Sequence, residues 1–332
     1  MKKISILAML VLASCCLALA SCGSGTNDSG STQENDDGLI VIGFSQVGAE
    51  SDWRIANTKS MRETFSEENG YKLILKDAQQ KPENQIAAIQ EFIKQNVDYI
   101  VVAPAAEEGW DGVLAEAKAA AIPVIIVDRM IDTADNSLYT CWVGSDFRNE
   151  GDVAVAWMET TFKDKADLKI VHLQGSIGSS AQIGRTEGLQ AGVARNPGWE
   201  IIHQASGDFT QVKGKEIIEY VLKQFDRIDV LYCENDNMAY GAIEAMDAEK
   251  RTYGVNGDVA VISFDATHDG LKATLEGKIN YNVECNPLHG PRVEAIIRQL
   301  ENGEVPDKLA FVEEEAFDAA TITQAIIDAR AY

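Results

Sequence analysis

Residues 99–129 read YIVVAPAAEEGWDGVLAEAKAAAIPVIIVDR, and this stretch decides the fold. Two uninterrupted apolar runs, at 99–103 and 124–127, enclose a segment with helical spacing at 110–121. Strands that are apolar along their whole length have both faces buried, which is typical of a parallel sheet covered by helices on either side. The stretch therefore predicts a strand–helix–strand unit of an α/β protein.

The same alternation fills the rest of the body. We expect further strands at residues 39–44, 72–75, 140–144, 168–173, 200–204, 230–233, 259–264 and 281–284, with an extended piece at 309–313. We expect helices at residues 53–65, 82–95, 150–162, 183–194, 213–224 and 238–249, another after Pro291, and a last one near 322–330.

The body is too long for one typical core, since about 295 residues follow the N-terminal segment. We therefore predict two doubly wound parallel-sheet lobes; that a three-segment hinge joins them is what the family resemblance described below implies. The predicted lobes are residues 38–144 plus 285–311 and residues 145–284 plus 312–332. The chain is expected to cross between them near Gly144, Glu284 and Leu309.

The N-terminus has the features of a secretion signal. An uncharged apolar run at 4–19 follows two lysines and ends in Leu-Ala-Ser-Cys at 19–22, which resembles the lipoprotein box of bacteria. We expect a signal peptide at 1–21, a lipidated Cys22, and a disordered polar tether at 22–37. An ordinary cleaved signal with Cys22 unmodified and a retained membrane span remain as alternatives.

Charge and cysteine content exclude several classes of function. The chain of 332 residues has a formal net charge of −23 and no long basic run, so neither nucleic acid nor an anionic membrane surface is an expected partner. Cys141, Cys233 and Cys285 lie in apolar strand-like contexts and are expected to be buried, although one pair could bridge. The four histidines have no metal-like spacing, so we expect no metal and no cofactor. The sequence has no nucleophile elbow and no paired-acid spacing, so we expect no catalytic residue.

Polar side chains gather directly after the predicted strands. In a doubly wound sheet, ligands bind outside the carboxyl ends of the strands. These strand ends carry Glu50, Trp53, Arg54, Asp128, Arg129, Arg185, Phe209, Asn235, Asp265 and Glu284. Carboxylates, guanidinium groups and amides together satisfy hydroxyls that both donate and accept, and aromatic faces suit the C–H faces of a sugar ring. An Asp beside an Arg, as at 128–129, could equally be a structural ion pair.

These motifs resemble those of the ribose and galactose class of periplasmic sugar-binding proteins. The similarity rests on residues 43–54, 77–85, 122–129, 173–176, 206–209, 235–242 and 264–270, and it covers the body from about residue 39 to the end. The insertion that places Trp53 and Arg54 two residues later than in a simple ribose pattern, with Glu50 ahead of it, is similar to the galactofuranose-binding subgroup. The resemblance implies the type I periplasmic binding protein fold.

The resemblance also implies a role for each residue. Asp128 and Arg129 would grip a monosaccharide from the first lobe. Arg185, Asn235 and Asp265 would grip it from the second lobe. Trp53 and Arg54 would stand where pentose-binding relatives carry paired aromatics, Phe209 would cover the ring, and Glu284 would add a further polar contact.

We therefore predict an extracytoplasmic lipoprotein that binds a galactofuranose-like sugar, or another pentose or hexose, by hinge closure. It would act as a monomer and deliver the sugar to an ABC transporter permease, touching the membrane only through its lipid. The alternatives are a sensor that presents its ligand to a membrane kinase or chemoreceptor, and a glycoside-acting enzyme. The glycine-rich loop at 175–180 could be a phosphate cradle, but it lacks the full P-loop and dinucleotide patterns.

Overall fold

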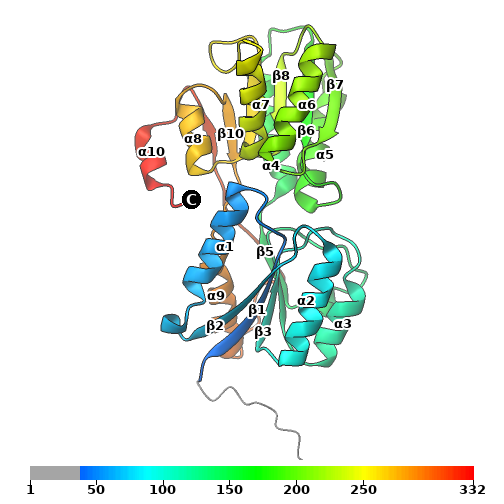
Figure 1. Ribbon diagram of the computed structural model, residues 1–332, viewed down its shortest axis with the longest axis vertical. Coiled ribbons are helices and arrows are strands. Elements are labelled where there is room, and N and C mark those ends of the chain that lie inside the picture. The colour runs from blue at the N-terminus through cyan, green and yellow to red at the C-terminus, as the bar shows by residue number, and fades with distance from the viewer. Residues whose placement is uncertain (1–37) are drawn as a thin grey trace, which may run out of the picture. The chain divides into compact units, whose positions relative to one another are not determined.

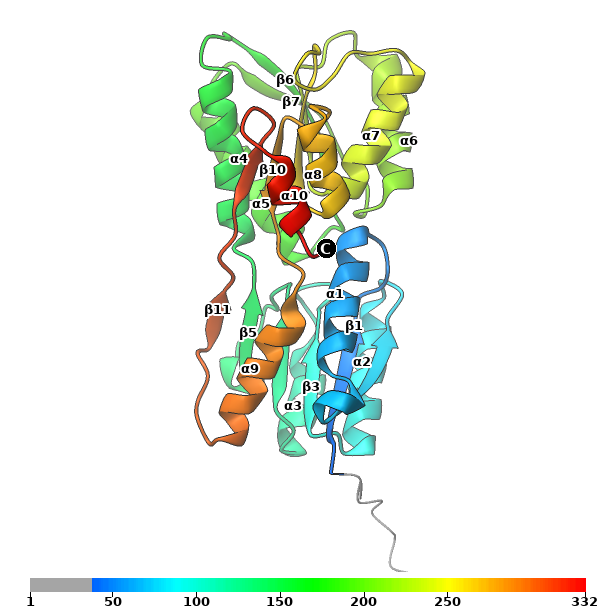
Figure 2. The ribbon, with the colours of Figure 1, turned by 90° about the vertical axis from the view of Figure 1, so that its left-hand side faces the viewer.

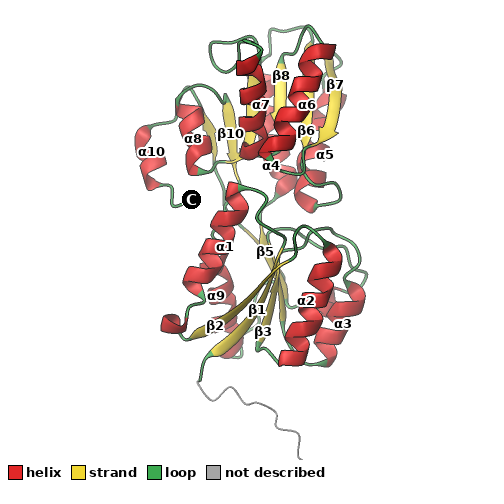
Figure 3. Ribbon diagram, viewed as in Figure 1, coloured by secondary structure: helices red, strands yellow, loops and turns green. Residues whose placement is uncertain are grey.

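The structure is a computed structural model that describes residues 38–332. The predicted signal peptide, Cys22 and the tether lie outside the described residues. Within 38–332 the chain forms two six-stranded sheets, each with helices on both faces (Figures 1 and 3). None of the helices in this range is long and apolar enough to cross a membrane.

The first lobe is a wholly parallel sheet in the strand order β11-β5-β4-β3-β1-β2. Its strands are β1 (Ile40–Gln46), β2 (Tyr71–Asp77), β3 (Tyr99–Val102), β4 (Val124–Val127), β5 (Cys141–Gly144) and β11 (Leu309–Phe311). Its helices are α1 (Asp52–Thr64) and α9 (His289–Glu301) on one face, and α2 (Pro82–Gln95) and α3 (Asp111–Ala119) on the other. Short 3-10 turns lie at Glu67–Asn69 and Asn136–Leu138.

The second lobe has the strand order β12-β10-β9-β8-β6-β7, and only the edge strand β12 runs antiparallel. Its strands are β6 (Leu168–Gln174), β7 (Trp199–Ser206), β8 (Val230–Cys233), β9 (Ala260–Asp265), β10 (Tyr281–Glu284) and β12 (Ala316–Asp318). Its helices are α4 (Phe147–Thr161), α5 (Ser180–Arg195), α6 (Gln211–Gln224), α7 (Asp236–Ala248), α8 (His268–Leu275) and α10 (Gln324–Ala329). Figure 2 shows α4 and α5 on one side of this sheet and α6 and α7 on the other.

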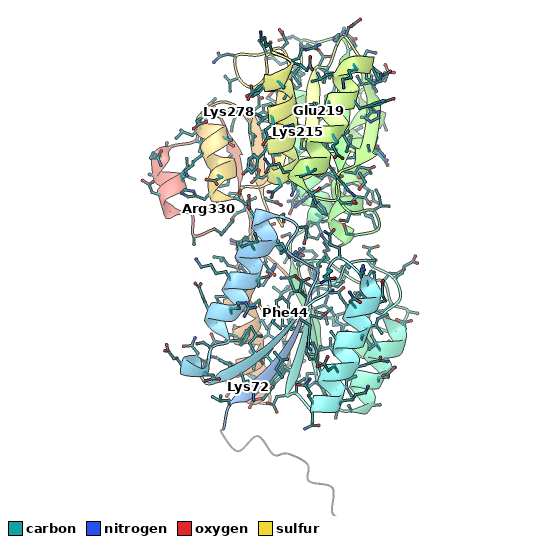
Figure 4. The ribbon with its side chains drawn as sticks, viewed as in Figure 1. Phe44, Lys72, Lys215, Glu219, Lys278 and Arg330 are labelled. Atoms are coloured by element: carbon teal, nitrogen blue, oxygen red, sulfur yellow. The ribbon has the colours of Figure 1, made fainter. Side chains whose placement is uncertain are left out.

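Apolar packing fills both faces of each sheet. In the first lobe Phe92 and Trp110 belong to the core on one face, while Phe44 and Met61 belong to the core on the other. Figure 4 labels Phe44 within this lobe, and its side chain is fully buried. Cys141, Cys233 and Cys285 are all buried and all free, so no disulfide forms among the described residues.

Two elements differ from the sequence-based expectation. The extended piece predicted at 309–313 is the single strand β11, and strand β12, which the chain forms after it has changed sheets, was missed. Helix α8 was missed: it spans eight residues, and its buried positions are Gly270, Leu271 and Thr274, which leave no apolar stripe to recognise.

Three segments connect the lobes, at 145–146, 285–288 and 312–315. Glu314, in the third segment, forms hydrogen bonds with both of the other segments. Its Oε1 atom accepts a hydrogen bond from Ser145 Oγ in the first segment at 2.7 Å and from the Asn286 backbone N–H in the second at 2.6 Å. Because one carboxylate joins the crossings, they are expected to move together when the lobes rotate.

His289 packs α9 against α1 in a fully buried position. Its Nδ1 atom accepts a hydrogen bond from Asn57 Nδ2 at 2.8 Å, its ring meets Trp53 edge-on with centroids 5.9 Å apart, and its Nε2 atom has no hydrogen-bond partner. Burial lowers the pKa of His289 from 6.5 to about 4, although Asp128 partly opposes the shift. The imidazole is therefore neutral in the folded protein at physiological pH.

This burial predicts a pH-dependent loss of stability. As the pH falls below 6.5 the unfolded chain protonates His289, whereas the folded protein does so only near pH 4, so stability falls across that window and not below it. We expect His289→Gln to remove up to about 3 kcal/mol of this pH dependence. Denaturant unfolding at pH 7 and pH 4 measures it. His268→Gln, at a partly exposed histidine, serves as the control, and equal pH dependence in wild type and His289→Gln would contradict the assignment.

Candidate functional site

A narrow cavity lies where the strand ends of the two lobes meet. Nine of the ten predicted site residues line it, namely Glu50, Trp53, Arg54, Asp128, Arg129, Arg185, Phe209, Asn235 and Asp265. Four residues that the sequence did not single out also line it, namely Ser51, Phe147, Ala181 and Cys285. Its volume of about 20 Å³ leaves room for roughly one water molecule.

A wider depression of about 880 Å³ runs along α1, α9 and the C-terminal residues. It is lined largely by exposed side chains such as Lys59, Glu63 and Arg298 and is open to solvent. We place the candidate site in the narrow cavity instead, because buried charged groups are concentrated there and charges are costly to desolvate without a function.

Strand and helix ends position the charged side chains. Asp128 follows β4, Asn235 follows β8 and Asp265 ends β9, so all three lie at carboxyl ends of parallel strands. Ser51 caps α1 by accepting from the Arg54 backbone N–H at 3.2 Å, and Asn235 caps α7 by accepting from the Met238 N–H at 2.9 Å. Both helices therefore begin at the cavity, where their N-terminal partial charge is positive.

Three of the site residues have left-handed backbone conformations. The φ angles are 63° at Asp128, 61° at Phe209 and 99° at Asp265. Such conformations cost a non-glycine residue about 1–3 kcal/mol each and concentrate at functional sites. Here they turn the chain at the strand ends, so this strain is part of how the cavity is built.

In the first lobe, two arginines share two carboxylates. Arg54 Nε donates to Glu50 Oε1 at 3.1 Å, and Arg54 Nη2 lies 2.8 Å from Asp128 Oδ2. Arg129 is further from the same groups, at 3.7 Å from Glu50 and 3.9 Å from Asp128. Burial lowers the pKa of Arg129, and the neighbouring Arg54 adds to the effect. Arg129 is thus the less satisfied of the two guanidinium groups.

In the second lobe, Arg185 contacts three acceptor groups. Its Nε donates to Glu150 Oε2 at 2.6 Å, its Nη1 donates to the Glu234 carbonyl oxygen at 2.5 Å, and its Nη2 lies 3.6 Å from Asp265 Oδ1. Burial raises the pKa of Asp265 well above its usual value, and the distant Arg185 offsets only part of this. Asp265 is therefore an incompletely paired carboxyl group.

Several buried polar atoms around the cavity have no hydrogen-bond partner. Among the described residues these include Glu50 Oε2, Asp128 Oδ2 and Arg129 Nε. Asp128 Oδ2 is close to Arg54, but the contact lacks the alignment of a hydrogen bond. Leaving such an atom unsatisfied costs about 1–3 kcal/mol. The cavity thus presents acceptors and a donor to a polar ligand.

The aromatic residues and the glycine-rich loop have distinct structural roles. The Trp53 indole N–H donates to the Cys285 carbonyl oxygen at 2.6 Å, and the Arg54 guanidinium covers its ring at 4.6 Å. Phe209 packs directly on Gly175, where an added Cβ atom would lie 1.9 Å from the ring. Gly175 therefore makes space for an aromatic residue of the cavity.

The structure does not place Glu284 in the cavity, which corrects the prediction for this residue. Its carboxylate accepts from Arg330 Nη1 and Tyr332 Oη at 2.5 Å each and from the Glu315 backbone N–H at 3.0 Å. Arg330 is labelled beyond α10 in Figure 4. Glu284 therefore ties the C-terminal residues to the end of β10, and the strand-end rule could not distinguish this role from ligand contact.

Sequence reasoning also missed Glu150 and Phe147. Both lie in the first turns of α4 rather than after a strand, and they contact Arg185 through a carboxylate and an aromatic face. The only signal was the helical pattern predicted at 150–162, which gives no reason for a buried carboxylate at its start. Long-range partners such as Arg185 become visible only in the folded chain.

Residues 42–289 match the periplasmic binding protein domain family. The galactofuranose-binding protein YtfQ of Escherichia coli (strain K12) is 39% identical over 276 residues, covering 82% of this chain and 86% of that protein. A Mycobacterium smegmatis structure in complex with β-D-fucofuranose has a TM-score of 0.81 and 41% identity, covering 85% of this chain and 92% of that one. The arabinose ABC transporter binding component from Shewanella sp. ANA-3, bound to α- and β-L-arabinofuranose, has a TM-score of 0.81 and 37% identity, covering 88% and 95%.

Two parallel-sheet lobes with a polar cavity at their strand ends define a solute-binding protein of the type I fold. The chain belongs to the periplasmic binding protein family, and its relatives are solute-binding proteins rather than enzymes. The predicted fold and family resemblance are confirmed.

The strained backbone at Asp265 predicts that glycine is the more stable residue at this position. Glycine adopts a φ of 99° freely, so Asp265→Gly removes both the strain and a poorly paired carboxyl group. We expect Asp265→Gly to be more stable than Asp265→Asn, which keeps the Cβ atom, by about 1 kcal/mol in denaturant unfolding. A glycine variant less stable than the asparagine variant would show that this conformation is not strained.

Proposed function

We propose that this protein is the extracytoplasmic solute-binding lipoprotein of an ABC sugar importer and binds one monosaccharide between its lobes. The observation that carries the proposal is that three buried atoms, Glu50 Oε2, Asp128 Oδ2 and Arg129 Nε, form no hydrogen bond, although Asp128 Oδ2 is ion-paired with Arg54. A sugar hydroxyl donates one hydrogen bond and accepts others, so adjacent hydroxyls satisfy the two carboxylate oxygens and the guanidinium N–H together.

Three of the relatives support a sugar in its five-membered ring form as the proposed ligand. They are named for or bound to galactofuranose, fucofuranose and arabinofuranose. We propose a galactofuranose-like sugar, with another pentose or hexose as the broader class. A small and crowded site with many charged groups suits a compact ring whose hydroxyls point in several directions.

Both lobes contribute to the proposed binding site. Glu50, Arg54, Asp128 and Arg129 would bind from the first lobe, and Arg185, Asn235 and Asp265 would bind from the second. Trp53 and Phe209 supply the apolar faces. Asn235 already donates to the Phe209 carbonyl oxygen at 3.0 Å, which leaves its second amide hydrogen for a ligand.

Sugar binding would require the lobes to separate and close again. The cavity of about 20 Å³ is smaller than any monosaccharide, so the paired side chains must part to admit one. Contacts between the lobes then hold the closed form: Asp52 and Asn237 exchange two hydrogen bonds of 3.0 and 3.1 Å, and the Met130 N–H donates to Ser180 Oγ at 2.9 Å. The moving bodies would be residues 38–144 plus 285–311 and residues 145–284 plus 312–332.

The N-terminal sequence supports the envelope role. The Leu-Ala-Ser-Cys box at 19–22 would anchor the protein through Cys22 at the outer side of the cell membrane, with 22–37 as a tether. We propose that the monomer delivers its sugar to a permease in its closed form. The role that we propose is therefore transport rather than glycoside chemistry.

Isothermal titration calorimetry tests the proposal against galactose, fucose, arabinose, ribose and glucose, with a galactofuranoside as the locked five-membered ring. We expect saturable binding of at least one furanose-forming sugar. Arg129→Ala should weaken it at least about thirtyfold, because truncation leaves buried carboxylates unpaired.

The control is Arg148→Ala, since Arg148 is exposed and pairs only with surface carboxylates. It should bind like the wild type. Flat heats for every sugar would refute the proposed function. Unchanged affinity in Arg129→Ala would refute the proposed site.

A further inference from the structure

Three potential metal ligands meet beside the hinge. Glu150 comes from α4, Cys285 from the second crossing between the lobes, and Glu314 from the third. The Cys285 sulfur and one carboxylate oxygen from each glutamate all lie within 4.8 Å of one another. Cys285 also lines the sugar cavity, but the proposed sugar contacts use neither its thiol nor Glu314.

One of these groups is buried and incompletely bonded. Glu150 is 2% exposed, and its Oε2 atom is held by Arg185 at 2.6 Å. Its Oε1 atom is buried and forms no hydrogen bond of normal geometry, although the Cys285 thiol lies close enough to favour the charged carboxylate. A buried carboxylate oxygen without a well-aligned donor is costly, so this atom points to a further partner.

The surroundings are strongly acidic. A cavity of about 220 Å³ adjoins the cluster and is lined by Glu150 and Glu314 together with Asp146, Glu284 and Glu315. Among residues 38–332, Arg185 is the only cation that forms an ion pair with any of the three clustered groups. This negative lining would attract a cation and offers it a route from solvent.

We propose that Glu150, Cys285 and Glu314 form a binding site for a divalent cation of the zinc type. A thiolate beside two carboxylates selects a borderline-soft ion over magnesium or calcium, which prefer oxygen ligands alone. Zinc bonds are about 2.0–2.3 Å long, so the ligand atoms around the ion would lie closer together than the present limit of 4.8 Å. Small side-chain rotations would bring them to that distance.

The supporting contacts orient two of the ligands. Glu314 Oε1 accepts from Ser145 Oγ and from the Asn286 N–H, and Ser145 Oγ also lies 3.3 Å from the Cys285 sulfur. Glu314 Oε2 and the Cys285 sulfur therefore remain for the ion, with a water molecule as a fourth ligand. The site would bridge α4 and two of the three crossings.

Cobalt(II) titration of the metal-free protein tests the proposal, because thiolate ligation gives an intense near-ultraviolet charge-transfer band. We expect the band to saturate at about one equivalent, zinc to displace it, and Cys285→Ser to abolish it. Glu314→Gln, which keeps the side-chain shape, should weaken binding at least about tenfold.

The matched controls are Cys141→Ser, a buried thiol in β5, and Glu313→Gln, an exposed neighbour of Glu314. Both should retain the band and the affinity. Absence of the band in the wild type, or its survival in Cys285→Ser, would overturn the proposal. Since no sugar is present in the titration, its failure would leave the proposed transport function unaffected.

Discussion

Charged side chains are buried away from water where the two lobes meet, and this burial determines the properties of the site. Arg54, Arg129 and Arg185 are each no more than 3% exposed, and their carboxylate partners are buried with them. Transferring such groups from water to the protein interior costs several kcal/mol of free energy per ion, and imperfect ion pairs recover only part of this free energy. The pairs at 3.6–3.9 Å and the unpaired oxygens show that protein groups alone leave the cluster undersatisfied.

The architecture places this cluster between bodies that can move. The chain crosses between the lobes three times, and each lobe is built around apolar cores. The charged groups of the two lobes face each other across the cavity. A ligand that bonds to both sides then stabilises the closed arrangement by its own interaction free energy. Binding and closure would then be a single event, as the proposed transport role requires.

Much of this arrangement could be predicted from the sequence. Unbroken apolar strands such as β4 and β8 predicted parallel sheets, which holds for every strand except the edge strand β12, and the strand-end rule then identified nine of the residues that line the cavity. The rule failed at Glu284, because a residue after a strand can bind either a ligand or the C-terminal tail. Glu150 was missed since its partner Arg185 is 35 positions away, and periodicity contains no information about pairs at that distance.

A crystal structure of the protein with its sugar tests the central claim most directly. The account predicts that ring hydroxyls lie within hydrogen-bonding distance of Glu50 Oε2, Asp128 Oδ2 and Arg129 Nε, while Asn235 or Asp265 binds the same molecule from the opposite lobe. A sugar held outside this cavity, or by one lobe alone with those three atoms still unpaired, would contradict it.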